Sequence, residues 1–249
     1  MNRSSSTPRL AARCAALLAA AGLALAGCSS SSSPSTSASS PAAGSASTGS
    51  SSTGSFTGTP LFPVTVGNTW VYQVKTLGIA GGTAVDKVTA VVPVAGGNQV
   101  TTTHDYHGTT VKETLLFGSN GSISMPLPSL GSSTFKIKSG GIVWPSHAQI
   151  VSGQPYHSTV KAAVTIAGQV HNVSTHVTVQ GAGSATVTVP AGTYHTTLIN
   201  DTLTEGFMGF SISLRIQTWL ASGIGPVKSE VTTNGTTVST EELKSFTKG

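Results

Sequence analysis

The sequence predicts a mainly β protein: a single domain built from an antiparallel sheet, with at most one or two short helices. Val and Thr dominate residues 56–249, and apolar residues there recur at every second position, as they do in a strand with one buried face. No stretch sustains the 3.6-residue apolar period of an amphipathic helix. Turn signals separate the apolar runs, and strands joined by tight turns form an antiparallel meander rather than βαβ units.

The first 28 residues have the pattern of an export signal. Three arginines precede the apolar run Ala15–Ala26, which is shorter than the roughly 20 residues needed to span a bilayer. The run ends in Leu25-Ala26-Gly27-Cys28. This tetrapeptide resembles the acylation box of bacterial lipoproteins, and the resemblance implies cleavage before Cys28 and a diacylglyceryl thioether on its sulfur. The alternative is an ordinary secretory signal in which Cys28 is incidental.

The lipoprotein interpretation divides the chain into three parts. We expect a signal peptide at residues 1–27, a lipidated Cys28 followed by a disordered linker to residue 55, and a β-rich globular domain at residues 56–249. Residues 29–55 contain only Ser, Thr, Gly, Ala and Pro, which cannot bury enough apolar surface to repay the entropy of ordering. The expected location is the extracytoplasmic face of the cell membrane, with the acyl chains of Cys28 as the anchor.

Charge argues against a nucleic-acid partner, and cysteine content argues against an internal disulfide. The whole chain carries 13 Lys and Arg against 8 Asp and Glu, and loss of the signal peptide removes three Arg and no acid, which leaves 10 against 8 and a net charge of +2. The remaining cations are scattered, without the basic runs that a nucleic-acid surface requires. Cys14 would leave with the signal peptide and Cys28 would be acylated, so no internal disulfide is expected. We expect a monomer.

Five windows show the strand alternation most clearly, although the second has mixed faces. The residues expected to share one face in each are Trp70, Tyr72 and Val74; Val111, Glu113, Leu115 and Phe117; Val160, Ala162, Val164 and Ile166; Val173, Val177 and Val179; and Ile212, Leu214, Ile216 and Leu220.

Turns are predicted between these windows. Asn120-Gly121 and Asn234-Gly235 are the strongest signals, because a type I′ turn needs positive φ at both central residues. Further turn candidates are Gly81-Gly82, Gly96-Gly97-Asn98, Gly140-Gly141 and Ala167-Gly168-Gln169. The best helix candidate is the short stretch Thr240–Phe246.

Three signatures follow one another along the domain. They are Phe62-Pro63 with Gly67-Asn68-x-Trp70-x-Tyr72, then Val189-Pro190-Ala191-Gly192-Thr193-Tyr194, and then Trp219-Leu220-Ala221-x-Gly223-Ile224-Gly225-x-Val227-Lys228. In this order they resemble a group of exported bacterial proteins of unknown function, which is similar to the LolA, LolB and LppX type of lipoprotein. The resemblance implies a strongly curved antiparallel sheet that forms a half-barrel.

Four aromatic residues of these signatures are the candidate ligand-binding residues: Trp219, Tyr194, Trp70 and Tyr72. They either supply apolar area to the core and its corners or line a ligand cleft. We expect Trp70 to be core, because its strand alternates cleanly. Trp219 shares its face with Arg215 and Gln217, so it projects from the polar face of its strand, where a ligand or a covering loop could lie.

The spacing of the histidines and acids does not match that of a catalytic, metal or cofactor site. His104 and His107 are three residues apart, which puts them on opposite faces of a strand unless a turn intervenes at Gly108. His171 and His176 also fall on opposite faces, and the histidines are expected on the polar surface. There is no G-x-S-x-G elbow, and the few acids are dispersed rather than paired as in glycosidases. We therefore expect a protein that is not an enzyme.

Two functions remain. In the first, the concave face of the curved sheet binds a lipid or another apolar envelope ligand without catalysis. In the second, a structural or interaction lipoprotein presents its β domain to the cell wall or to a protein partner. The resemblance in fold favours the first function by analogy.

Overall fold

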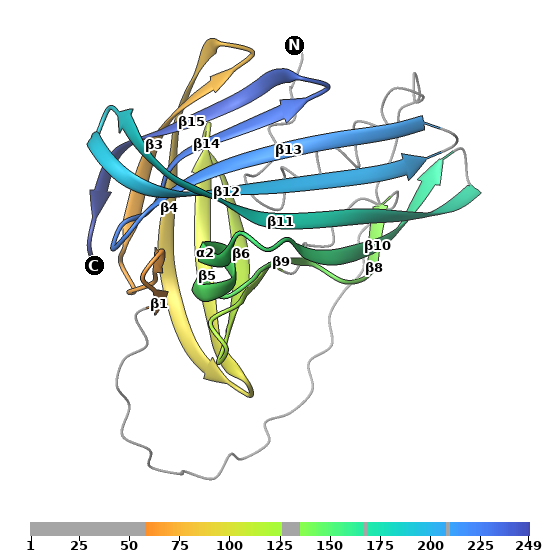
Figure 1. Cartoon of the computed structure of the whole chain (residues 1–249), viewed down its shortest axis with the longest axis horizontal. Helices are drawn as coiled ribbons and strands as arrows, with labels where there is room; N and C mark the ends of the chain where they lie inside the picture. The colour runs from red at the N-terminus through yellow and green to blue at the C-terminus, as the bar shows by residue number, and fades with distance from the viewer. Residues whose placement is uncertain (1–57, 126–134, 167–168, 208–209) are drawn as a thin grey trace.

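The computed structural model describes residues 58–125, 135–166, 169–207 and 210–249 (Figure 1). The predicted signal peptide, Cys28 and the linker lie outside these residues, as does the turn candidate at Ala167-Gly168.

Strands and one short helix make up the regular structure of the described residues, so the mainly β prediction is confirmed. The elements are β1 (Gly58–Thr59), β2 (Phe62–Pro63), β3 (Thr69–Thr76), β4 (Ile79–Val94), β5 (Gly97–Tyr106), β6 (Thr109–Gly118), β7 (Ile123–Met125), β8 (Phe135–Ser139), β9 (Ile142–Trp144), α2 (His147–Ser152), β10 (Tyr156–Ile166), β11 (Gln169–Val189), β12 (Gly192–Phe207), β13 (Phe210–Ala221), β14 (Gly225–Thr233) and β15 (Thr236–Thr247). Over the same residues, no helix has the length and apolar character needed to cross a bilayer.

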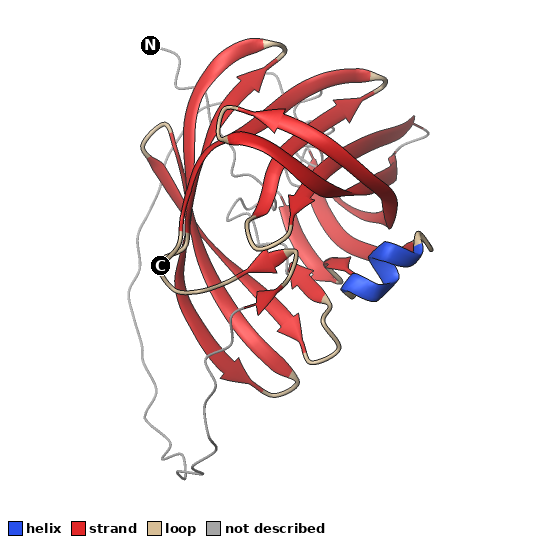
Figure 2. Cartoon of the chain, turned by 60° about the vertical axis from the view of Figure 1, so that its left-hand side comes forward, coloured by secondary structure: helices blue, strands red, loops and turns tan. Residues whose placement is uncertain are grey.

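One antiparallel sheet of 13 strands dominates the fold, in the order β8-β10-β11-β12-β13-β14-β15-β3-β4-β5-β6-β7-β9. Most neighbours are consecutive hairpins, as predicted for a meander, and β15 pairs with β3, which brings the end of the domain beside its beginning. The sheet is strongly curved, and α2 lies against the β11 side of the fold (Figure 2). The short ribbon of β1 and β2 stands apart from the large sheet in its hydrogen bonding and contacts β14.

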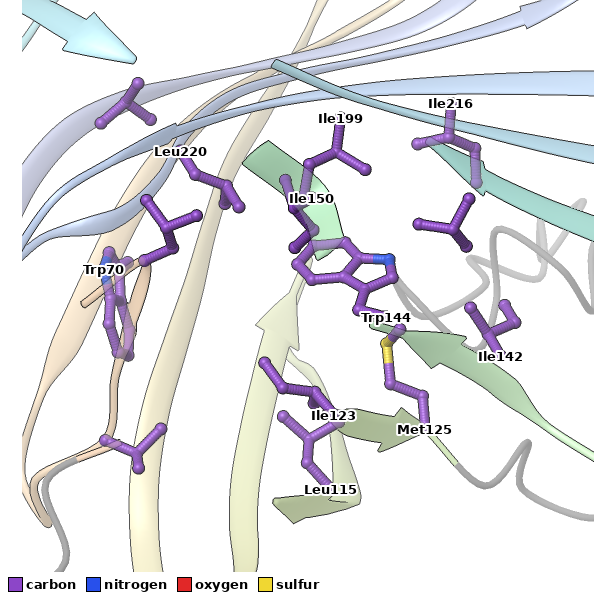
Figure 3. Packing of buried hydrophobic residues seen from close by; sticks show 14 of the residues in the cluster. Trp70, Leu115, Ile123, Met125, Ile142, Trp144, Ile150, Ile199, Ile216 and Leu220 are labelled. Carbon is purple, nitrogen blue, oxygen red and sulfur yellow. The ribbon is translucent and has the colours of Figure 1, made fainter. Parts of the chain in front are cut away.

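The inner face of the curved sheet holds a single hydrophobic core. The predicted alternation is confirmed where side chains are described: the buried members are Trp70, Tyr72, Val74, Leu115, Phe117, Val160, Ala162, Val173, Val177, Val179, Leu214, Ile216 and Leu220. Side chains from both halves of the sheet point toward one another around Trp144 of β9 (Figure 3). Trp144 is anchored there by its indole Nε1, which donates to Asp201 Oδ2 of β12 at 3.0 Å.

The predicted turns differ in kind. Asn234 and Gly235 both have positive φ, 50° and 79°, which confirms the type I′ turn between β14 and β15. At Asn120-Gly121 only Gly121 has positive φ, and Gly121 N–H bonds to Gly118 O, so the four-residue connection between β6 and β7 contains a type I turn followed by a left-handed Gly. A turn lies at the Gly96 candidate, whereas Gly140 and Gly141 join β8 to β9 without forming a turn.

The prediction of a turn at Gly81-Gly82 is wrong. Both glycines lie inside β4, where the pairing with β3 shifts register between Val74 and Lys75. Gly82 has a φ of 112°, so the pair accommodates an irregularity within a continuous strand rather than a chain reversal.

The helix prediction for Thr240–Phe246 is also wrong, because these residues lie in β15 and pair with strands on both sides. Within the described residues the helix is α2, which begins at a capping box: Ser146 and Gln149 exchange side chain to backbone hydrogen bonds. It ends at Gly153 in the left-handed conformation. Gly181 of β11 lets the helix approach, since a Cβ there would lie 1.8 Å from Ile150 O.

Candidate functional site

Trp70 and Tyr72 project from β3 into the core, and each polar tip is held by the start of β14 or the turn before it. Trp70 Nε1 donates to Ile224 O at 2.6 Å, and Tyr72 Oη donates to Pro226 O at 3.0 Å. Buried Trp and Tyr require such partners, because an unpaired buried donor costs about 1–3 kcal/mol. The first and third sequence signatures therefore meet in space and fix the β13–β14 hairpin against β3.

Tyr194 and Trp219 lie elsewhere. Tyr194 Oη donates to Ala191 O at 3.1 Å, within the tight corner where β11 ends and β12 begins. Trp219 is half-buried on the face of β13 opposite Thr218 and Leu220, as predicted, with the Lys228 ammonium 5.0 Å from its ring centroid. The structure thus brings Trp70 and Tyr72 together but separates them from these two residues, whose ligand role stays a prediction.

A central cavity lies between the two halves of the sheet. Its volume is about 70 Å³, room for about five water molecules, within a wider depression that is open to solvent. Trp70, Leu115, Ile123, Met125 and Trp144 form its apolar wall, and Figure 3 shows Trp70 facing Trp144 across this region with Leu115 and Ile123 below. Tyr72 and Phe62 also border it. Of the four candidate aromatic residues, Trp70 and Tyr72 line this cavity.

Polar side chains line the cavity as well. They are Asp86, Thr102, His104, Glu113, Thr218, Ser229 and Glu241. Strand register explains how they meet, because residues paired across antiparallel strands lie on the same face. Asp86 pairs with Trp70 on one side and His104 on the other, Thr102 pairs with Glu113, and Ser229 pairs with both Thr218 and Glu241.

His104 and Asp86 form a hydrogen-bonded pair among these polar side chains. His104 Nδ1 lies 2.5 Å from Asp86 Oδ1, and the side chains are 5% and 30% exposed. A carboxylate accepts, so the proton of this hydrogen bond sits on Nδ1. His104 Nε2 is buried and has no hydrogen-bond partner among the described residues.

An imidazole oriented by a carboxylate is also two-thirds of a hydrolytic triad. Such a triad needs a nucleophile within about 3 Å of the free ring nitrogen. Among the described residues no Ser or Thr hydroxyl bonds to His104 Nε2. The arrangement can orient and bind a polar group, but the described part of the chain does not complete a nucleophilic site.

These polar residues were missed at the level of sequence, and the expectation of surface histidines is wrong for His104, which is buried. A turn does intervene after it, because His107 and Gly108 have φ of 53° and 73° and reverse the chain between β5 and β6. The acids, dispersed in the sequence, converge through strand pairing. One local signal was readable: Glu113 shares a strand face with Leu115 and Phe117. No cluster of metal-ligating side chains is present in the described ranges.

Solved structures share this fold. A protein of Parabacteroides distasonis ATCC 8503 described as a candidate lipoprotein aligns with a TM-score of 0.55 at 15% identity, covering 76% of this chain and 99% of its own. A protein of Bacteroides fragilis NCTC 9343, described as a candidate exported protein with a YmcC-like fold, aligns with a TM-score of 0.52 at 17% identity, covering 75% of this chain and 98% of its own. At these identities the likeness concerns the fold, and the finer likeness to LolA stays a prediction.

Among curated proteins, no sequence matches this chain. The chain does match a protein family. Residues 66–243, from just before β3 to Leu243 of β15, match the DUF3108-like family. That range takes in the residues that line the central cavity, except Phe62, and the second and third signatures. The chain therefore belongs to the DUF3108-like family.

Proposed function

We propose that this protein is a membrane-anchored extracytoplasmic lipoprotein whose β domain binds a lipid or other apolar envelope ligand without catalysis. The observation that carries the proposal is the central cavity, which is lined by aromatic and aliphatic side chains together with several polar groups. Ligand sites are typically concave, largely apolar and furnished with a few polar groups. The Cys28 box supports the anchor, and the descriptions of the two structural neighbours are consistent with an exported protein.

The cavity volume limits how much of the ligand can enter. About 70 Å³ accommodates the end of one short chain rather than the whole of a multi-chain lipid. The rest of a larger ligand would lie in the open part of the depression. The four residues Trp70, Tyr72, Leu115 and Met125 would then contact its apolar end.

Native mass spectrometry tests this function. The protein carrying Cys28→Ala cannot be acylated, so any lipid found with it is bound non-covalently. Leu115→Trp adds six side-chain heavy atoms to a buried cavity wall, whereas Leu116→Trp places the same group on the exposed side of the same strand. We expect a co-purifying amphiphile in the parent and in Leu116→Trp, and its loss in Leu115→Trp. Equal occupancy of the two variants, or an empty parent protein, would reject the cavity as the binding site.

An interaction role has one observation in its favour. Leu77 and Ile79, at the β3–β4 hairpin, are 64% and 74% exposed, and Leu77 holds a φ of 49° that side chains rarely adopt. An exposed apolar tip is a typical contact site for a partner. A photo-crosslinking residue at position 77 should then capture one discrete partner in cells, while one at the exposed position 170 should not. Equal labelling at both positions would remove this alternative.

A further inference from the structure

We propose that the Asp86–His104 pair recognises a hydrogen-bond donor on the ligand, so that the cavity selects alcohols and amines over fatty acids and phosphate esters. The inference rests on the proposed function, because it assigns a chemical class to the ligand of the same cavity. It identifies the head group of a small amphiphile, whereas the apolar wall identifies only its tail.

The first argument is the direction of the hydrogen bonds. His104 Nδ1 donates to Asp86, so in the neutral form of the ring Nε2 is an acceptor, and Asp86 itself presents carboxylate oxygens. Both groups of the pair therefore accept. Nε2 is buried without a partner in the described residues, and the cost of burying an unpaired acceptor would be relieved by a bound donor.

The second argument is charge. Three carboxylic acids, Asp86, Glu113 and Glu241, line the cavity. Lys228 also borders it, but its ammonium lies 2.7 Å from Glu230 Oε1 and 5.0 Å from the Trp219 ring centroid, so it is already engaged. A carboxylate or phosphate head group entering beside the Asp86 carboxylate would meet like charge in a partly desolvated site, which is unfavourable.

The third argument is orientation. Asp86 is 30% exposed while His104 is 5% exposed, so the pair runs from the solvent toward the interior. Trp144 and Met125, on the apolar wall, are buried. An amphiphile therefore fits with its chain toward Trp144 and Met125 and its donor at the pair. Less than 1 Å² of His104 Nε2 is accessible, so the donor first meets Asp86 and reaches Nε2 only when a neighbouring side chain moves aside.

Probes of similar size separate recognition of a hydrogen-bond donor from exclusion of an anionic head group. The full chain carrying Cys28→Ser and Trp219→Phe needs no detergent and leaves Trp70 and Trp144, which both border the cavity, as its fluorophores. It is titrated at pH 8 with 1-hexanol, hexylamine, hexanoate and dipropyl ether, an ether with as many heavy atoms as hexanol and no donor. We expect hexanol and hexylamine to bind about 3- to 10-fold more tightly than dipropyl ether, the range of one net hydrogen bond, and hexanoate to bind weakest.

Two variants assign the preference to the pair. His104→Phe should abolish the preference of hexanol over dipropyl ether, and Asp86→Asn should reduce it even if His104→Phe fails to fold. His157→Phe, the same change at an exposed strand position, should leave it intact. The inference is overturned if wild-type protein binds the alcohol and the ether equally, if hexanoate matches hexanol, or if folded variants of the pair keep the preference. In each of those cases the cavity still binds, so the proposed function stands. If no probe changes the fluorescence, both the function and the inference fail.

Discussion

Replacing Trp70 with Phe should destabilise the protein far more than the same change at Trp219. Trp70 is 3% exposed, stacks on Phe246 with 5.2 Å between ring centroids, and donates to Ile224 O at 2.6 Å. Phe cannot donate, so the carbonyl of Ile224 loses its partner at a cost of about 1–2 kcal/mol. The smaller ring gives up about 1 kcal/mol more of buried apolar contact.

The expected total for Trp70→Phe is therefore about 2–3 kcal/mol, which lowers the Tm of a domain of this size by about 4–12 °C. Trp219→Phe weakens a half-buried cation–π contact with Lys228 and should cost no more than about 1 kcal/mol. Urea unfolding of both variants measures the difference in free energy of unfolding, and thermal unfolding measures the Tm, each followed by circular dichroism. Equal losses in the two variants, or a Tm shift below about 2 °C for Trp70→Phe, would refute the assignment of Trp70 to the core.

Three further changes test other parts of the structure. Gly181→Ala should cost about 1–3 kcal/mol in urea unfolding, because its Cβ would meet Ile150 O, while the exposed Ser184→Ala should stay within about 0.5 kcal/mol; equal effects would contradict the close contact. Burial raises the pKa of the Glu205 carboxyl above its usual 4.5, so the stability this group contributes is present below that pH and lost as pH rises through the raised value. Glu205→Gln should remove this loss of stability between pH 4 and pH 7. If the free energy of unfolding depends on pH in the same way in both proteins, the assignment of this effect to Glu205 is wrong. Cys28→Ala should release the protein from membranes or leave an uncleaved precursor, and wild-type fractionation and migration would disprove the lipid anchor.

Local periodicity was enough to predict much of the sheet. The alternation of Trp70, Tyr72 and Val74 follows from the strand period alone, and strand pairing then buries that face. The same local reasoning misassigned Thr240–Phe246, because hydrogen bonds to β3 and β14 on both sides decide its conformation. Tertiary context of this kind overrides weak local preference.

The helix that was missed had a readable signal. Ser146 is followed three residues later by Gln149, which is the spacing of a capping box, and Gly153 stands where a helix of this length ends. The segment is short and Ile150 is its one buried residue, so it shows no helical apolar period that would have supported this signal.

The polar side chains that line the cavity could not be predicted in the same way. Asp86 and His104 are 18 residues apart, and Glu241 comes from the far end of the domain. They meet because β4 pairs with β5, because β15 returns to β3, and because bulges set the register of both pairings. Sequence spacing carries no information about such pairings, whereas the aromatic signatures pointed to Trp70 and Tyr72 directly.

The measurement that tests the central claim most directly is methyl NMR of Met125. Its side chain is buried and borders the cavity, so its methyl group reports on anything that enters. With ¹³C-methyl methionine in the unacylated protein, and the Met125 resonance identified by Met125→Leu, 1-hexanol should shift that resonance saturably. The same titration of Leu115→Trp should leave it in place, because the added ring occupies the cavity. A Met125 resonance that does not move in the parent protein at saturating hexanol would contradict a ligand-binding cavity.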